Sequence, residues 1–170
     1  MKIPLDYLCV KTGVLCPRCQ GLVSSGQVGE YEVDVLRALL DLEEKPDFKF
    51  LHESTYVKSF KSKDVLIVVI DEPNELIDPR VLSKLSRSLS EYLNVKARVI
   101  TNVKDLKELV KQLVFPARIS GVNTIWLPDG SVEHIIRVPR QESRHLPIRR
   151  ELLEEILTNI VGSVVRVRTE

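Results

Sequence analysis

The chain of 170 residues lacks the features of several specialised protein classes. Its longest aliphatic run, residues 65–70, is far shorter than the roughly 20 residues that a membrane-spanning helix needs. Its first residues lack the apolar segment of a signal peptide. Its three cysteines are an odd number, which does not suit an extracellular disulfide framework. These absences predict a cytoplasmic protein without a membrane segment.

Charge, catalytic motifs and aromatic residues are equally sparse. The formal net charge is +1, so there is no overall electrostatic attraction to nucleic acid. No nucleophile elbow, phosphate-binding loop or zinc-protease motif is present, and the three histidines are scattered, so we expect no enzyme. Of the few aromatic residues, Trp126 is expected in the core. Asn and Gln are scarce and Met occurs once, a composition typical of thermophiles.

The cysteines that are present all fall within the first 19 residues. Cys16 and Cys19 have the two-residue spacing that lets one turn direct two thiolates at one metal ion. Asp6 and Cys9 repeat that spacing with a carboxylate in place of one thiolate. The pattern predicts a four-ligand zinc site. A Cys16–Cys19 disulfide is the alternative, and His52 is an alternative fourth ligand.

Hydrophobic periodicity predicts an α+β protein in which one order of elements occurs twice. We expect a cysteine knuckle and connector over residues 1–29, a first module over 30–101 and a second module over 102–170. The expected elements of the first module are a helix at 30–44, strands at 48–60 and 65–70, a helix at 79–93 and a strand at 95–100. Those of the second are a helix at 105–114, a hairpin of strands 117–127 and 132–138, a helix at 148–160 and a strand at 164–167.

This order resembles the tandem KH modules of the transcription factor NusA, and several segments resemble an archaeal group of NusA-like KH proteins. The similar segments are Leu-Cys-Pro-Arg-Cys at 15–19, Pro-Ala-Arg-Ile-Ser-Gly-Val-Asn at 116–123, Pro-Asp-Gly at 128–130 and Arg-Val-Pro at 137–139. The resemblance implies two KH-like modules of type II, each a three-stranded sheet with helices on one face. It also implies a paired-cysteine knuckle, whose first position is Asp6 here.

The chain departs from the KH pattern at the loop that contacts RNA. KH modules grip the backbone of four nucleotides with a Gly-x-x-Gly loop, because glycine lets the main chain approach phosphate closely. The corresponding segments here are 75–80 and 139–147, and neither contains glycine. The first has acids around it, Glu72, Glu75 and Asp78, which would repel phosphate. The fold can therefore persist while the standard grip on RNA is lost.

Cationic residues gather in two places. Helix 79–93 carries three on one solvent face, with acids nearby, which favours an ordinary solvated surface. Segment 137–150 is richer in arginine and has only Glu142 in opposition, which favours a binding surface. The predicted nucleic-acid-binding residues are Arg80, Lys84, Arg87, Arg137, Arg140, Arg144, Arg149 and Arg150.

These patterns lead to two functional hypotheses. The first is a non-enzymatic RNA-binding or transcription-associated module that binds single-stranded RNA, with the loops degenerate. The alternative is a protein–protein adaptor that has lost RNA binding and docks on RNA polymerase or another partner with an acidic surface. The missing glycines favour the adaptor, and the arginines of segment 137–150 favour RNA.

Overall fold

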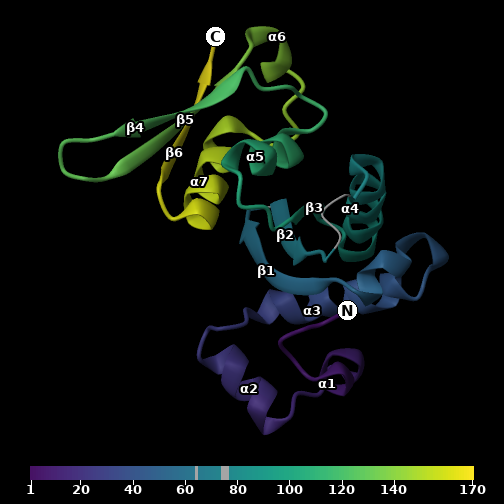
Figure 1. Cartoon of the computed structure of the whole chain (residues 1–170). Coiled ribbons are helices and arrows are strands. Elements are labelled where there is room, and N and C mark those ends of the chain that lie inside the picture. The colour runs from purple at the N-terminus through teal and green to yellow at the C-terminus, as the bar shows by residue number, and fades with distance from the viewer. Residues whose placement is uncertain (64, 74–76) are drawn as a thin grey trace. The chain divides into compact units, whose positions relative to one another are not determined.

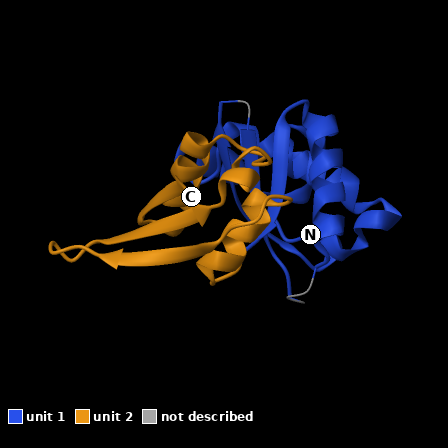
Figure 2. Ribbon diagram, turned by 90° about the horizontal axis from the view of Figure 1, so that it is seen from above, with its two compact units in different colours: residues 1–102 blue, residues 103–170 orange. Residues whose placement is uncertain are grey.

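The computed structural model, which describes residues 1–63, 65–73 and 77–170, is an α+β protein with two three-stranded sheets (Figure 1). The chain divides into two compact units, residues 1–102 and 103–170 (Figure 2). Each unit has its own sheet and its own helices. The first 29 residues belong to the first unit.

Two short helices form the N-terminal segment, α1 over Tyr7–Thr12 and α2 over Pro17–Ser24. Gly13 ends α1 in the left-handed conformation that glycine adopts without strain. Pro17 occupies the first turn of α2, where a missing N–H costs nothing. The expectation of a connector from residue 21 onward is therefore wrong as far as Ser24, because α2 continues to that residue.

The remaining elements of the first unit build a helix-covered sheet. They are α3 over Glu30–Glu43, the 3-10 helix η1 over Pro46–His52, β1 over Thr55–Ser62, β2 over Val65–Asp71, α4 over Pro79–Leu93 and β3 over Lys96–Thr101. β2 pairs antiparallel with β1 and parallel with β3. The strand expected from residue 48 begins only at Thr55, because Phe48 and Leu51 are both buried at the three-residue spacing of a 3-10 turn.

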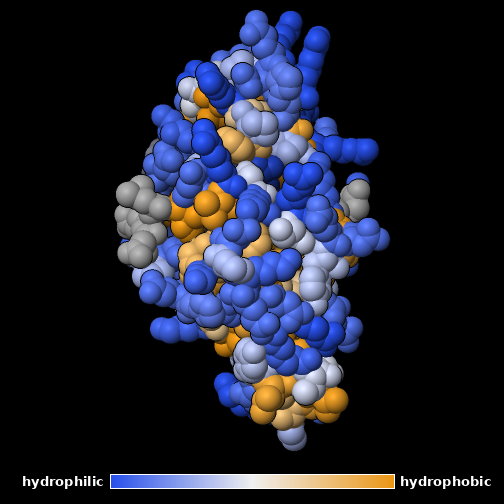
Figure 3. Space-filling view, turned by 90° about the vertical axis from the view of Figure 1, so that its right-hand side faces the viewer, coloured by the Kyte–Doolittle hydropathy of each residue, from blue (hydrophilic) through white to orange (hydrophobic). Residues whose placement is uncertain are grey.

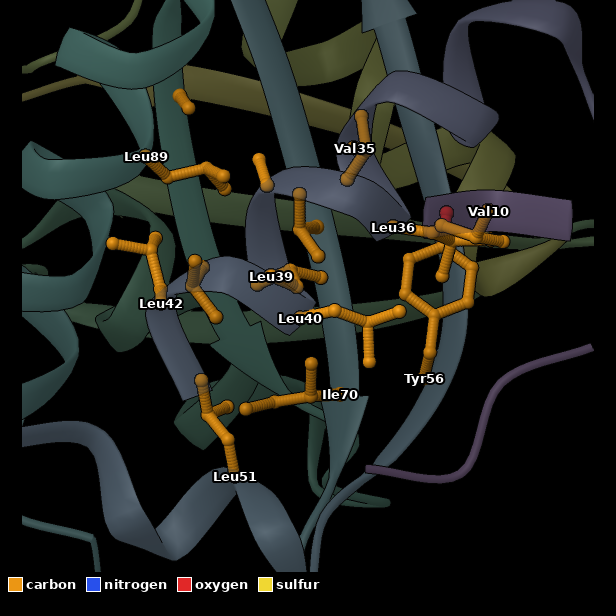
Figure 4. Packing of buried hydrophobic residues seen from close by; sticks show 14 of the residues in the cluster. Val10, Val35, Leu36, Leu39, Leu40, Leu42, Leu51, Tyr56, Ile70 and Leu89 are labelled. Carbon is orange, nitrogen blue, oxygen red and sulfur yellow. The ribbon is translucent and has the colours of Figure 1, made fainter. Parts of the chain in front are cut away.

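The core of the first unit lies between α3, α4 and one face of the sheet. Figure 4 shows Leu39 and Leu40 of α3 among Ile70 of β2 and Leu89 of α4. Val10 of α1 lies beside this core and is fully buried. The N-terminal segment is therefore packed into the first unit, where it shares the hydrophobic core.

The second unit has the same order of strand pairing. Its elements are α5 over Leu106–Val114, β4 over Gly121–Trp126, β5 over Val132–Val138, α6 over Arg140–Ser143, α7 over Arg150–Val161 and β6 over Val164–Thr169. β5 pairs antiparallel with β4 and parallel with β6. Gly162 ends α7 in the left-handed conformation, as the sequence predicts.

The two units share one structural detail, a polar contact between the second helix and the edge strand. Each helix has two side-chain oxygens, one turn apart, that accept hydrogen bonds from strand N–H groups. In the first unit Ser86 and Ser90 accept from Val99 and Ala97, both at 2.9 Å. In the second, each partner lies 68 residues later: Glu154 accepts from Val167 at 2.7 Å and Thr158 from Val165 at 3.2 Å.

The same spacing relates the helix ends, Asn94 and Gly162, which are both left-handed. From the central strand to the last strand, the two units are thus the same length and have the same hydrogen-bonded geometry. The order of elements that occurs twice in the sequence is an internal structural repeat.

Candidate metal centre and candidate nucleic-acid interface

The four predicted metal ligands come together at the starts of α1 and α2. Asp6 precedes the first turn of α1 and Cys9 lies within it, while Cys16 precedes α2 and Cys19 lies one turn in. One ligand atom from each lies within 4.8 Å of every other. Two helix starts, each with ligands three residues apart, therefore converge on one point.

Hydrogen bonds hold the four side chains in this arrangement. The Asp6 N–H donates to Cys19 Sγ, and the Cys16 N–H donates to Cys9 Sγ, both at 3.3 Å. The Cys16 thiol donates to Asp6 Oδ2 at 3.3 Å. Arg18 binds the second oxygen of that carboxylate, Oδ1, at 3.1 Å. The backbone of each ligand pair thus orients a sulfur atom of the other pair.

The thiols influence one another's ionisation. The Cys19 backbone N–H, and then its thiol, lower the pKa of Cys16. The Asp6 N–H lowers the pKa of Cys19, but burial and the Cys16 and Cys9 sulfur atoms outweigh it and raise that pKa to about 11. A second thiolate beside the first is therefore unfavourable in protein alone. A divalent cation is the species that stabilises several thiolates together.

The two alternatives for this cluster have different outcomes. All three cysteines are free thiols, so the structure contains no Cys16–Cys19 disulfide. His52 is not part of the cluster, because its Nδ1 lies 2.8 Å from the carboxylate of Glu43. The donor set that the structure brings together is Asp6 with the three cysteines.

Ion pairs and a backbone contact attach the metal-ligand segment to α3. Lys11 binds Asp41 at 2.7 Å and Glu44 at 3.1 Å. Lys11 and then Tyr92 lower the pKa of the Asp41 carboxyl through hydrogen bonds. Arg37 Nε donates to the carbonyl of Val10 at 2.9 Å. The candidate metal centre is therefore fixed to the main helix of the first unit.

Apolar side chains surround this centre on the outside. Tyr7, Leu8 and Val14 are exposed by 52%, 73% and 75%. Figure 3 shows hydrophobic surface gathered at the lower end of the molecule, where Figure 1 places α1. We define these three residues as the α1 patch.

The cationic residues predicted on α4 all lie at the surface. Lys84 pairs with Asp47 at 2.8 Å and Arg87 with Glu91 at 3.7 Å. Arg80 is exposed at the start of the helix, where its N–H binds the Asp78 side chain. Of the acidic loop before α4, Glu75 lies outside the described residues. Burial, and then Glu53 and Asp71, raise the pKa of Glu72 to about 7.

The cationic residues of the second unit surround the helix–loop–helix formed by α6 and α7. Arg140 begins α6, Arg144 ends it, and Arg149 and Arg150 stand at the start of α7. All four are exposed. Within residues 1–63, 65–73 and 77–170, no carboxylate lies at ion-pair distance from Arg140, Arg144 or Arg149, whereas Arg150 is 4.0 Å from Glu151.

Arg137 lies on β5 and has a neighbour that the sequence analysis missed. Arg168 of β6 is its direct register partner, so both point to the same face of the sheet, away from buried Val138 and Val167. Arg137 pairs with Glu170 at 3.5 Å, and its guanidinium lies against Gly121. The alternation of valine and arginine in β6 is the signal that places Arg168 outward.

Trp126 is 75% exposed at the end of β4, so the expectation that it belongs to the core is wrong. It precedes the turn of the β4–β5 hairpin, which extends beyond the helices of its unit (Figure 2). No helix of that unit lies over this end of the hairpin in the figure, so apolar sequence neighbours are not enough to bury the ring.

Comparison with known proteins leaves the function open. No family model matches the chain, and no curated protein matches it. The crystal structure of a protein designated APE1850 is similar, with a TM-score of 0.51 and 18% identity over 78% of this chain and 96% of that one. This likeness concerns the fold alone. Among the described residues, no helix is both long and apolar enough to cross a bilayer.

Proposed function

We propose that the protein is a non-enzymatic RNA-binding module that contacts single-stranded RNA through α6, α7 and the loop between them. The observation that carries this proposal is the group of exposed arginines there without carboxylate partners. Arginine guanidinium groups are suited to phosphate oxygens, and a series of unpaired ones along one segment matches the spacing of a nucleic-acid backbone. The nearby pair Arg137 and Arg168 extends the cationic surface onto the sheet.

The architecture supports a KH-like origin for both units. Each has a mixed three-stranded sheet and a helix that binds the parallel edge strand, as in a type II, NusA-like module. In the second unit, the helix–loop–helix of α6 and α7 occupies the place of the Gly-x-x-Gly loop. Without glycine, contact with phosphate falls to side chains. In the first unit, acids occupy that place, so we assign RNA binding to the second.

We further propose that Asp6, Cys9, Cys16 and Cys19 hold one zinc ion. Ligand atoms about 2.0–2.3 Å from a tetrahedral ion lie roughly 3.3–3.8 Å from one another, close to the arrangement in the structure. Zinc accepts thiolate and carboxylate ligands, and four protein donors leave no position for substrate. The role is therefore structural: the ion joins α1 and α2 against α3.

The RNA proposal predicts a loss of salt-dependent binding when two arginines are removed. Arg140→Ala with Arg144→Ala should weaken binding of single-stranded RNA by about tenfold, because two phosphate contacts are lost. The dependence of log K on log salt should flatten by about 1.4, or about 0.7 per contact. Filter binding against salt concentration, on several RNA sequences, measures both quantities, and the loss should be the same for all sequences.

Lys84→Ala with Arg87→Ala is the matched control. It removes two charges from side chains that already pair with Asp47 and Glu91, and should change neither affinity nor slope. A wild type that binds while the Arg140 and Arg144 variant keeps its full slope would place the RNA elsewhere.

The second candidate function, a protein–protein adaptor, is favoured by the α1 patch. An apolar group presented on a metal-fixed segment suits a protein partner better than nucleic acid. If wild-type protein fails to bind RNA even at low salt, the adaptor becomes the better proposal. The same arginines would then face an acidic partner such as RNA polymerase, and Leu8→Ala should weaken its capture.

A further inference from the structure

The two sheets have four outer edges, formed by β1, β3, β4 and β6. An unprotected edge strand presents unpaired N–H and C=O groups to any other strand, so proteins usually block such edges. β3 and β6 are blocked by their helices, because Ser86 and Ser90 occupy two N–H groups of β3 and Glu154 and Thr158 occupy two of β6.

β1 is protected in three other ways. The N-terminal segment pairs with its start, where the Tyr56 N–H donates to the Lys2 carbonyl at 2.9 Å. A register shift between Tyr56 and Lys58 distorts the strand. Lysines at 58 and 61 add charge along the edge. Bulges and lysines are two of the common means of preventing strand addition.

β4 has none of these protections within its unit. Gly121–Trp126 contains no charged residue and no proline, and its register with β5 is continuous. The Leu127 N–H binds the Ser131 carbonyl, which sets the alternation of the ladder. The backbone groups of Val122, Thr124 and Trp126 therefore point outward, and no strand of the second unit pairs with them.

We propose that β4 pairs with β4 of a second copy of this chain, antiparallel and about a two-fold axis at Thr124. In this register, Val122 of one copy lies opposite Trp126 of the other, and both belong to the set of residues with outward backbone groups. The two sheets join into one of six strands. This proposal is independent of RNA binding and of the metal.

The chemistry of β4 favours a second copy over another partner. The strand is uncharged, so two copies meet without repulsion. The symmetric register creates two pairs of an aromatic and a β-branched residue, which stabilise antiparallel strands. It also covers part of Trp126, which is 75% exposed in the single chain. A strand pair alone buries less than the roughly 1,200 Å² of a standard interface, so the dimer is weak, with micromolar affinity.

Sedimentation velocity of the full-length, metal-loaded chain over a concentration series tests the proposal. Wild type should associate to a dimer. Thr124→Pro should raise the dimer dissociation constant by at least about tenfold, because proline removes the central outward N–H. Thr124→Ala, which keeps that N–H, is the matched control and should dimerise. Trp126→Lys, which adds edge charge without touching the backbone, should also dissociate the dimer.

Amide hydrogen exchange locates the interface without any substitution. The amides of Val122, Thr124 and Trp126 should become protected as concentration rises, while those of Asn123 and Ile125, which face β5, are protected at every concentration. A wild type that stays monomeric, a dimer that survives in both Thr124→Pro and Trp126→Lys, or protection that does not change with concentration would each overturn the proposal. An extended peptide that binds β4 of a monomer would identify the alternative occupant.

Discussion

Cys19→Ala is expected to remove the metal ion and to lower the free energy of unfolding of the first unit by at least about 3 kcal/mol. Cys19 is fully buried, and its sulfur atom accepts the Asp6 N–H. The apparent binding free energy of structural zinc in small domains is about 10–16 kcal/mol, and most of it contributes to folding. Without the ion, α1 and α2 keep only the contacts that bind them to α3.

Metal analysis of protein purified without chelator, combined with urea unfolding, measures both effects. Wild type should contain one equivalent of zinc, and the variant almost none. Gln20→Ala is the matched control, since Gln20 is exposed beside Cys19 on the same helix and is not a candidate ligand. Wild type that carries no metal after purification and after incubation with zinc, and that unfolds at the same urea concentration as Cys19→Ala, would contradict the proposed centre.

Leu39→Ala should destabilise the first unit by about 2–5 kcal/mol, because it leaves a cavity in a core that cannot fully collapse. Leu39 is fully buried in the cluster that α3, α4 and the sheet form (Figure 4). Urea unfolding followed by circular dichroism measures the change as a lower midpoint with a similar slope.

Leu8→Ala makes the same chemical change on the surface, in the α1 patch, and should change stability by less than about 0.5 kcal/mol. A cost for Leu39→Ala as small as that of Leu8→Ala would mean that α3 does not pack as described. The pair of variants thus separates core packing from the exposed apolar surface that the adaptor hypothesis uses.

Elements with a strong local signal followed from the sequence with little error. Helix α4 runs over Pro79–Leu93 as predicted, with the Asp78 side chain accepting the Arg80 N–H at its start. Its leucines recur at helical spacing, and proline at the first position fits only a helix start. The four metal-ligand candidates also came from spacing alone, because two ligands three residues apart lie on one side of a turn.

Elements with an ambiguous local signal were assigned incorrectly. Phe48 and Phe50 alternate with polar residues as in a strand, yet Phe48 and Leu51 are the pair that the core buries. Trp126 has apolar neighbours in sequence, but its position depends on which helices reach the end of the hairpin. Periodicity reports which residues prefer burial and leaves open whether another element covers them.

The sequence by itself determined the order of the elements, the repeat and the identity of the candidate metal ligands, because these depend on spacing along the chain. The tertiary structure alone decided that α1 and α2 join the core, that His52 pairs with Glu43, that Arg168 lies beside Arg137 and that β4 is the unprotected edge. These features arise from contacts between residues far apart in the chain. Which surfaces are covered is set by those contacts, and local preference does not contain that information.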